Sequence, residues 1–251
     1  MTLEAMTGKS HEKRDAEYCS PRRRFLKQTL SLIPIAAVGG SLNPLVAQAA
    51  KTKSEGVSAD YVPTFFNQEE WQFVLAAIGR LIPEDEYGPG GVSEGVPVFI
   101  DKQMELPYGH GHLWYMQGPF ASAEPELGYQ SSLVPRDTWR RGIAAVNAHC
   151  RKQQNKAFAE LSAAQQDDLL HQLEGGKLTF DSVDGKLFFT QMLENAKEGY
   201  FADPLHGGNQ TLASWKLIGF PGARADYQQV MDNPGKPYPL GPVSISGKRS
   251  V

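Results

Sequence analysis

The chain has 251 residues, of which 41% are hydrophobic, 10% aromatic and 21% charged, and this ordinary globular mix excludes disorder throughout. Its 25 Lys and Arg against 28 Asp and Glu give a formal net charge of −3, so no nucleic acid is expected as a partner. The two cysteines, Cys19 and Cys150, exclude a disulfide scaffold and a four-cysteine metal site.

The first feature along the chain is a basic run, followed by a short apolar segment and small residues. Residues 22–27 read RRRFLK, and Ala47 and Ala49 have the spacing of a signal-peptide cleavage site. The apolar segment is short and contains Pro34, so it does not predict a membrane span. The pattern resembles the signal of the twin-arginine (Tat) export route, with Pro21 where that signal usually has Ser or Thr. The residues predicted to form the export signal are Arg22, Arg23, Phe25, Leu26 and Lys27.

A general secretory signal and an amphipathic basic helix are the alternatives for this region, and the weak hydrophobicity and the long stretch before the arginines argue against both. Four segments are predicted: a signal at 1–49, a flexible lead at 50–61, a helical domain at 62–226 and an extended tail at 227–251. Residues 1–49 hold seven Lys and Arg and four Asp and Glu, so the remaining chain carries 18 against 24, a net charge of −6.

The region after residue 62 shows helical periodicity with strong start signals. Asn67 with Glu70, and Ser162 with Gln165, have the spacing of capping boxes. No segment of similar length alternates strictly between apolar and polar residues, so the predicted fold class is mainly α. It is a small helical domain with long irregular loops and a Pro/Gly-rich extended tail. The predicted helices cover residues 68–82, 97–106, 136–154, 163–174, 181–200 and, as a short element, 211–217.

Three stretches are predicted to be irregular. Residues 107–132 are rich in aromatic residues without periodicity, and residues 199–209 are dense in glycine. Residues 234–242 contain four prolines, which forbid a helix and favour an extended path. Such segments either cover the chain's own core or lie against a partner.

Residues that could carry chemistry are few. The sequence has no dinucleotide-binding glycine fingerprint, no phosphate-binding lysine loop and no haem-attachment motif. His110 and His112 could approach a metal from a loop, but no third ligand follows at a familiar spacing. Cys150 follows a helical apolar run and is predicted to be a buried, inert thiol that cannot pair with the adjacent His149. Residues 84–86 (EDE) could hold an acid/base pair, but they are typical of a solvated loop.

Several blocks, in their order and spacing, carry a family resemblance. They are residues 65–71 (FFNQEEW), 81–85 (LIPED), 95–101 (GVPVFID), 115–120 (YMQGPF), 199–209 (GYFADPLHGGN) and 215–222 (WKLIGFPG). With these blocks the chain resembles the small, or gamma, subunit of membrane-associated FAD-dependent sugar and polyol dehydrogenases, the gluconate 2-dehydrogenase subunit 3 family.

The resemblance implies a chain without a cofactor or an active site of its own. It implies a large catalytic partner of the glucose-methanol-choline type that binds FAD, and a multihaem cytochrome c subunit. FAD, an iron–sulfur cluster and haem c are expected on these partner subunits. The Tat translocase would export the folded pair on the signal of the small subunit, to a periplasmic position peripheral to the inner membrane through the complex.

Aromatic residues dominate the energetics of protein interfaces, which suggests where the partner binds. Each residue predicted to lie in this interface could equally complete the chain's own core. A free-standing exported enzyme with an unrecognised metal or carboxylate site, and an export chaperone that later dissociates, are the competing functions. The substrate stays open among gluconate, glucose, fructose and sorbitol. The predicted interface residues are Trp114, Tyr115, Phe120, Tyr200, Phe201, His206, Trp215 and Phe220.

Overall fold

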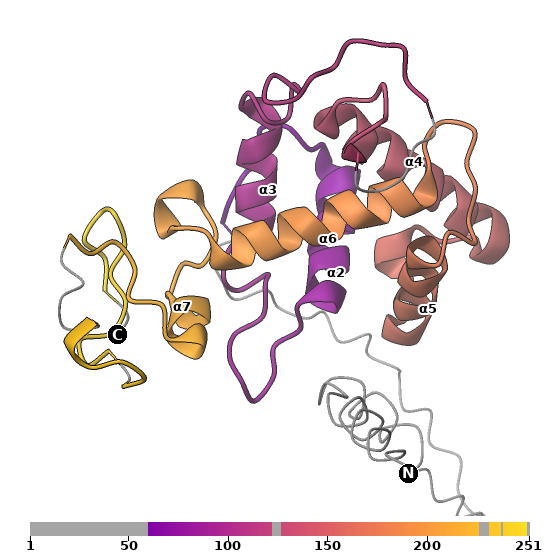
Figure 1. Cartoon of the computed structure of the whole chain (residues 1–251). Coiled ribbons are helices and arrows are strands. Elements are labelled where there is room, and N and C mark those ends of the chain that lie inside the picture. Colours follow the sequence, from indigo (N-terminus) through magenta and orange to yellow (C-terminus); the bar gives the residue numbers. More distant parts are fainter. Residues whose placement is uncertain (1–59, 122–126, 226–230, 237, 250–251) are drawn as a thin grey trace, which may run out of the picture. The chain divides into compact units, whose positions relative to one another are not determined.

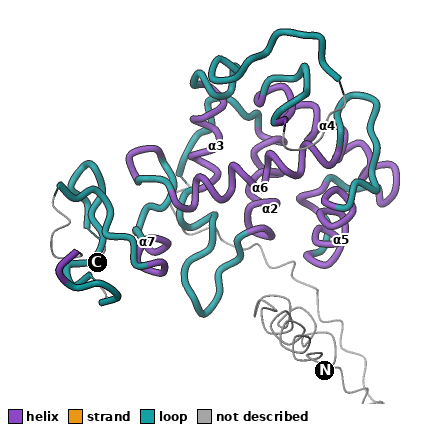
Figure 2. Tube along the Cα trace, in the orientation of Figure 1, coloured by secondary structure: helices purple, strands orange, loops and turns teal. Residues whose placement is uncertain are grey.

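The computed structural model describes residues 60–121, 127–225, 231–236 and 238–249, so the predicted signal and nearly all of the predicted lead lie outside it. Within these residues the chain is helical and has isolated β-bridges but no strand, which confirms the predicted class (Figures 1 and 2). The α-helices are α2 (Gln68–Leu81), α3 (Val96–Glu105), α4 (Pro135–Gln154), α5 (Ala163–Glu174), α6 (Gly185–Phe201) and α7 (Ala213–Ile218), and the short 3₁₀ helices are η2 (Phe158–Glu160) and η3 (Pro204–His206).

Helix α6 is the element around which the others are arranged. It contacts α2, α3, α4, α5 and α7, and Figure 1 shows it running across α2 and α3. Its residues Phe188, Met192 and Ala196 are fully buried at the four-residue spacing of one helix face. None of the described helices is long and apolar enough to cross a membrane.

Aromatic rings join these helices in the core. Trp139 of α4 packs edge-on against Phe188 of α6 and against Phe66, with 5.6 Å between ring centroids in each pair. The ring centroid of Phe73 in α2 lies 4.7 Å from that of Phe158 and 6.0 Å from that of Phe188. The indole N–H of Trp139 is also satisfied, because it donates to Oδ1 of Asn195 at 3.0 Å. Burying large rings in this way supplies much of the hydrophobic free energy of folding.

Both predicted capping boxes are confirmed. The Asn67 side chain accepts a hydrogen bond from the Glu70 amide at 2.9 Å, and the Glu70 carboxylate accepts from the Asn67 amide at 2.9 Å. Ser162 and Gln165 make the same reciprocal pair at the start of α5. These contacts satisfy amides that a helix terminus leaves without a partner in the helix.

The predicted start of α6 at residue 181 is wrong by four residues. The helix begins at Gly185, because the side chain of Asp184 caps the Leu187 amide at 2.8 Å and the backbone of Asp184 pairs with Thr179 in a β-bridge. Val183 is buried, but it lies before the helix and not within it. The short helix also starts later than predicted, at Ala213, because Leu212 has a left-handed backbone with φ 61°.

We expect Gly142→Ala to lower the free energy of unfolding by about 2 kcal/mol, although alanine normally favours a helix over glycine by about 1 kcal/mol. Gly142 lies where α4 meets α6, and a Cβ there would come within 2.3 Å of the Phe188 ring. Gly79→Ala in α2 is the matched control, because its nearest neighbour would be Val92 Cγ2 at an ordinary 3.7 Å. In urea unfolding, Gly142→Ala should lower the free energy of unfolding and Gly79→Ala should raise it. If both substitutions raised it, the close packing of Gly142 against the Phe188 ring would be contradicted.

Candidate partner-binding surface

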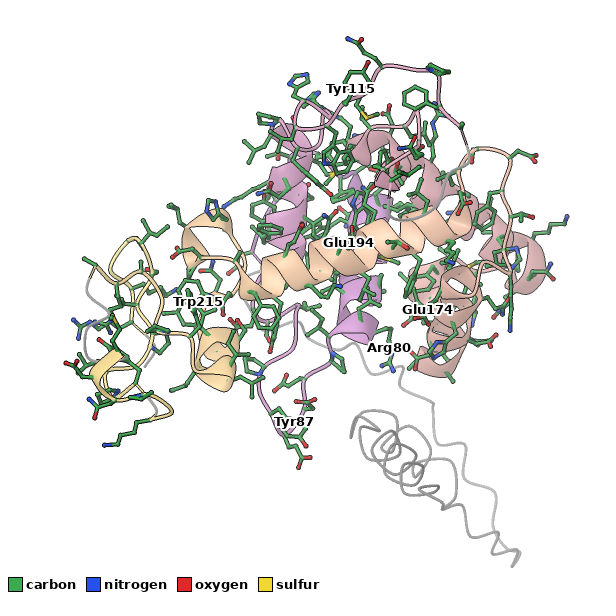
Figure 3. The ribbon with its side chains drawn as sticks, in the orientation of Figure 1. Arg80, Tyr87, Tyr115, Glu174, Glu194 and Trp215 are labelled. Carbon is green, nitrogen blue, oxygen red and sulfur yellow. The ribbon has the colours of Figure 1, made fainter. Side chains whose placement is uncertain are left out.

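The aromatic residues of the loop after α3 divide into buried and exposed ones. The Trp114 ring is half-buried between Tyr108 and Tyr129, with ring centroids 5.5 and 4.5 Å away. Tyr115 is 79% exposed, and Phe120 is exposed as well. Figure 3 shows Tyr115 at the edge of the molecule. Of the predicted interface residues here, Tyr115 and Phe120 are accessible to a partner, while Trp114 mainly holds the loop.

The end of α6 shows the same division. Tyr200 is half-buried, and its hydroxyl donates to the carbonyl of Pro89 at 2.9 Å. Burial raises the pKa of this phenol, and the nearby Glu94 carboxylate raises it further. The next residue, Phe201, is exposed and packs edge-on against the Tyr200 ring. Tyr200 therefore fixes the end of α6 against the loop before α3, and Phe201 remains accessible.

Trp215 of α7 belongs to the core of the chain itself. Its side chain is 6% exposed, and its indole N–H donates to the carbonyl of Phe201 at 2.8 Å. Phe220 lies edge-on to it with 4.9 Å between ring centroids and is exposed on its other side. His206, at the end of η3, is also exposed. Phe201, His206 and Phe220 are thus accessible, whereas Trp215 is buried.

Sequence reasoning missed several exposed aliphatic side chains at this end of the domain. Leu217 is 53% and Ile218 59% exposed on α7, and Leu205 of η3 is exposed too. The available signal was the pair Leu217 and Ile218, which directly precedes the helix-ending Gly219. A six-residue helix cannot bury every side, so of two adjacent apolar residues at its end at least one is expected to face out.

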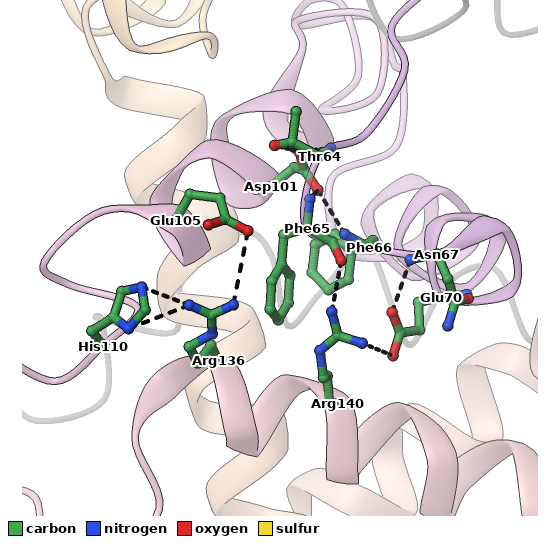
Figure 4. A network of polar contacts seen from close by, with 10 residues as sticks. All are labelled: Thr64, Phe65, Phe66, Asn67, Glu70, Asp101, Glu105, His110, Arg136 and Arg140. Carbon is green, nitrogen blue, oxygen red and sulfur yellow. Dashed lines mark hydrogen bonds and ion pairs between the residues drawn. The ribbon is translucent and has the colours of Figure 1, made fainter.

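A buried carboxylate, also missed, fixes the chain before α2 (Figure 4). Asp101 of α3 is fully buried, and its Oδ2 accepts from the Thr64 amide and hydroxyl and from the Tyr61 hydroxyl at 2.8–3.0 Å. Its Oδ1 accepts from the amides of Phe65 and Phe66 at 3.1 and 3.0 Å. Burial, together with the bond to Asp101, raises the pKa of the Tyr61 phenol to about 12. The Tyr61 hydroxyl therefore stays protonated and donates to this carboxylate at neutral pH.

Two arginines of α4 hold the same segment from the other side. The guanidinium groups of Arg136 and Arg140 lie 4.9 and 4.3 Å from the centroid of the Phe65 ring. Arg140 also donates to the carbonyl of Phe65 at 2.8 Å, and Arg136 contacts Nε2 of His110 at 2.6 Å. These contacts hold the segment before α2 against α3 and α4, and His110 contributes through its contact with Arg136 (Figure 4).

Two more buried carboxylates fix the glycine-dense loop that follows α6. Glu94 is fully buried and accepts from the Thr211 amide at 2.9 Å and from the Thr211 hydroxyl at 2.5 Å. Asp203 accepts from the amides of Leu205 and Ile245 at 3.0 and 2.7 Å. The second bond ties residue 245 of the predicted tail to η3, and a β-bridge between Gly222 and Val243 adds to it. The prediction that the tail as a whole is extended stays a prediction.

The residues considered for chemistry fall into three groups along the chain: residues 84–86, the histidines His110 and His112, and the neighbours His149 and Cys150. Cys150 is buried as predicted, and burial raises the pKa of its thiol to about 11. The ring of the adjacent His149 faces Phe180 instead. Residues 84–86 are exposed, as predicted for a loop. His112 stacks on His110, and within the described part of the chain no three His, Cys, Asp or Glu side chains gather as a metal ligand set would.

A family model described as gluconate 2-dehydrogenase subunit 3 matches residues 68–222. The chain belongs to this family. No curated protein and no solved structure gives a match.

The gluconate 2-dehydrogenase subunit 3 match begins at the first residue of α2 and ends at Gly222, so it includes all the α-helices described above. It confirms the resemblance drawn from the sequence blocks, which nearly all fall within it. The family description is that of one subunit of a dehydrogenase complex with several subunits.

Proposed function

We propose that this chain is the non-catalytic small subunit of a periplasmic, membrane-associated, FAD-dependent sugar or polyol dehydrogenase of the gluconate type. It binds and stabilises the catalytic flavoprotein subunit and carries that subunit through the Tat pathway on its own signal. The family match over residues 68–222 is the observation that carries this proposal. The twin arginines explain how a partner without its own signal reaches the periplasm.

The surface of the domain supports the partner-binding part of the proposal. Soluble chains that act alone expose large apolar side chains singly, whereas interfaces collect them. Here Leu217, Ile218 and Phe220 are exposed within four residues on and just after α7, and Tyr115 and Phe120 are exposed in the loop after α3. A subunit that works only in a complex needs such surfaces.

The partners follow from the same proposal. The catalytic subunit is of the glucose-methanol-choline type and carries FAD, with an iron–sulfur cluster and haem c also on partner subunits. Electrons pass from the flavin to a multihaem cytochrome c and on toward the membrane. This chain contributes shape and stability to the complex, and substrate recognition resides in the catalytic subunit.

The test is to recover the native complex on this chain. An affinity tag inserted within the lead at 50–61 leaves the signal and the C-terminal segment unaltered. We expect the tagged chain, isolated from the periplasmic and membrane fractions, to bring a large flavoprotein with flavin and haem absorbance. A colourless chain without partners would contradict the proposal in favour of a transient export chaperone. Dehydrogenase or hydrolase activity of the purified chain alone would favour a free-standing enzyme.

A further inference from the structure

Four exposed apolar side chains lie on α7 or on the residues next to it, near the buried Trp215. We call Phe201, Leu217, Ile218 and Phe220 the α7 surface. Phe201 and Phe220 are both joined to Trp215, the first through its carbonyl and the second by ring contact. Leu217 and Ile218 lie two and three residues after Trp215 in α7. Trp215 itself is labelled in Figure 3, and its indole is fixed by the bond to the carbonyl of Phe201 and by the Phe220 ring.

The charge of this end differs from that of the rest of the domain. The described residues from 60 to 200 hold 18 Asp and Glu against 11 Lys and Arg, whereas those from 201 to 249 hold two against five. One of the two, Asp203, is buried with both its oxygens bonded to backbone amides. The basic residues of this stretch are Lys216, Arg224, Lys236, Lys248 and Arg249, and we call them the basic rim. Arg249 bridges to Val243, and Val243 bridges to Gly222, which lies against the Trp215 ring, so this part of the chain returns to α7. An apolar patch with a basic rim complements an acidic partner surface.

The α7 surface is held in one shape, and this favours a protein partner over a lipid surface. The backbone of Thr211, just before α7, is bonded to the buried Glu94, and residue 245 is bonded to Asp203. Gly208 lies so close to the end of α6 that a Cβ on it would come within 1.9 Å of the carbonyl of Gly199. Preorganisation lowers the entropy lost when two specific surfaces dock, whereas a fluid bilayer offers no fixed shape to match.

We propose that the α7 surface is the docking surface for the catalytic flavoprotein subunit, which presents an apolar patch with an acidic rim to it. This inference rests on the proposed function and adds the place and the chemistry of the contact. Phe201 and Phe220 insert into the partner, and Leu217 and Ile218 extend the apolar contact. The basic rim faces the acidic residues around the partner's apolar patch. Trp215 acts from within the domain as a positioning residue.

The test compares two double substitutions to glutamate in the full chain, produced together with the flavoprotein subunit. Leu217→Glu with Ile218→Glu changes the α7 surface. Val62→Glu with Tyr87→Glu is the control, because these two side chains are 80% and 69% exposed and lie outside both the α7 surface and the loop after α3. Circular dichroism and thermal unfolding verify that both variants fold. We expect the first variant to bind the flavoprotein at least about tenfold more weakly and the control to stay within about twofold of the unchanged chain.

Each outcome separates the two proposals. If the unchanged chain retains the flavoprotein and the α7 variant retains it equally, the docking surface is elsewhere and the proposed function stands. If the control loses binding as well, the α7 surface is not the specific site. If the unchanged chain retains no flavoprotein, the proposed function itself is wrong.

A second measurement distinguishes a protein partner from a membrane. The purified chain is mixed with vesicles of phosphatidylglycerol and phosphatidylcholine and sedimented. We expect the unchanged chain and the variant with Leu217→Glu and Ile218→Glu to sediment with the vesicles to the same extent. If the α7 variant lost vesicle binding but kept the flavoprotein, the surface would be a membrane contact and the proposed docking would be overturned.

The basic rim is tested by Lys248→Glu with Arg249→Glu. This variant should associate with the flavoprotein more slowly, and the association rate should depend less on salt.

Discussion

Replacing both Arg22 and Arg23 by lysine is expected to abolish export of this chain and, with it, of the flavoprotein subunit. The change keeps the charge but removes the planar guanidinium groups, whose paired donors an ammonium group cannot reproduce. If the flavoprotein is exported only through its contact with this chain, both proteins accumulate in the cytoplasm. Fractionation with immunoblots of both chains, and flavin absorbance of the periplasmic fraction, measure the result.

Arg24→Lys is the matched control for this experiment. It is the same substitution at the next residue, which lies outside the arginine pair in the resemblance to the Tat signal. Export should stay at the level of the unchanged chain. If the doubly substituted chain stays in the cytoplasm while the flavoprotein still reaches the periplasm, the flavoprotein has its own route and the carrier role is wrong.

Asp101→Ala is expected to lower the free energy of unfolding by at least about 3 kcal/mol, because it leaves several donors without an acceptor. The amides of Phe65 and Phe66 belong to buried residues and each loses its partner, while the hydroxyls of Tyr61 and Thr64 are closer to solvent. The segment before α2 would detach from α3, which should also expose the Phe65 ring that Arg136 and Arg140 cover (Figure 4).

Two further substitutions define the cause of this loss. Asp101→Asn keeps one acceptor oxygen but places an amide group opposite donors, so its effect should lie between that of alanine and the unchanged chain, at about 1–2 kcal/mol. Asp137→Ala removes an exposed aspartate of α4 and should change the free energy of unfolding by less than about 0.5 kcal/mol. Equal unfolding midpoints in urea for Asp101→Ala and Asp137→Ala would show that the Asp101 contacts contribute little.

The sequence predicted best those features that depend on neighbouring residues. The starts of α2 and α5 were found because a capping box joins residues only three positions apart, and Cys150 was placed in the core because it continues one face of a helix. The start of α6 was wrong because Asp181 and Asp184 are both suitable caps. The backbone bridge from Thr179 to Asp184 decides between them.

The candidate surface depended on contacts that no local pattern contains. Trp215 and Phe220 are both aromatic and lie close in sequence, yet one is buried and the other exposed. The residues that decide this come from α6, whose last carbonyl accepts the Trp215 indole hydrogen. Likewise, Asp101 and Glu94 resemble surface carboxylates in the sequence, and their burial is possible only because backbone amides from distant segments satisfy them.

The sequence by itself determined the helical class, most helix ends and the family, since each of these is written in residues a few positions apart or in short motifs. The export signal, read from such a motif, stays a prediction. Only the tertiary structure decided which aromatic side chains serve the core and which remain free for a partner. It also revealed the three buried carboxylates that fix the segments before α2 and after α6. Burial is a property of what packs over a residue, and those covering groups lie tens of residues away along the chain.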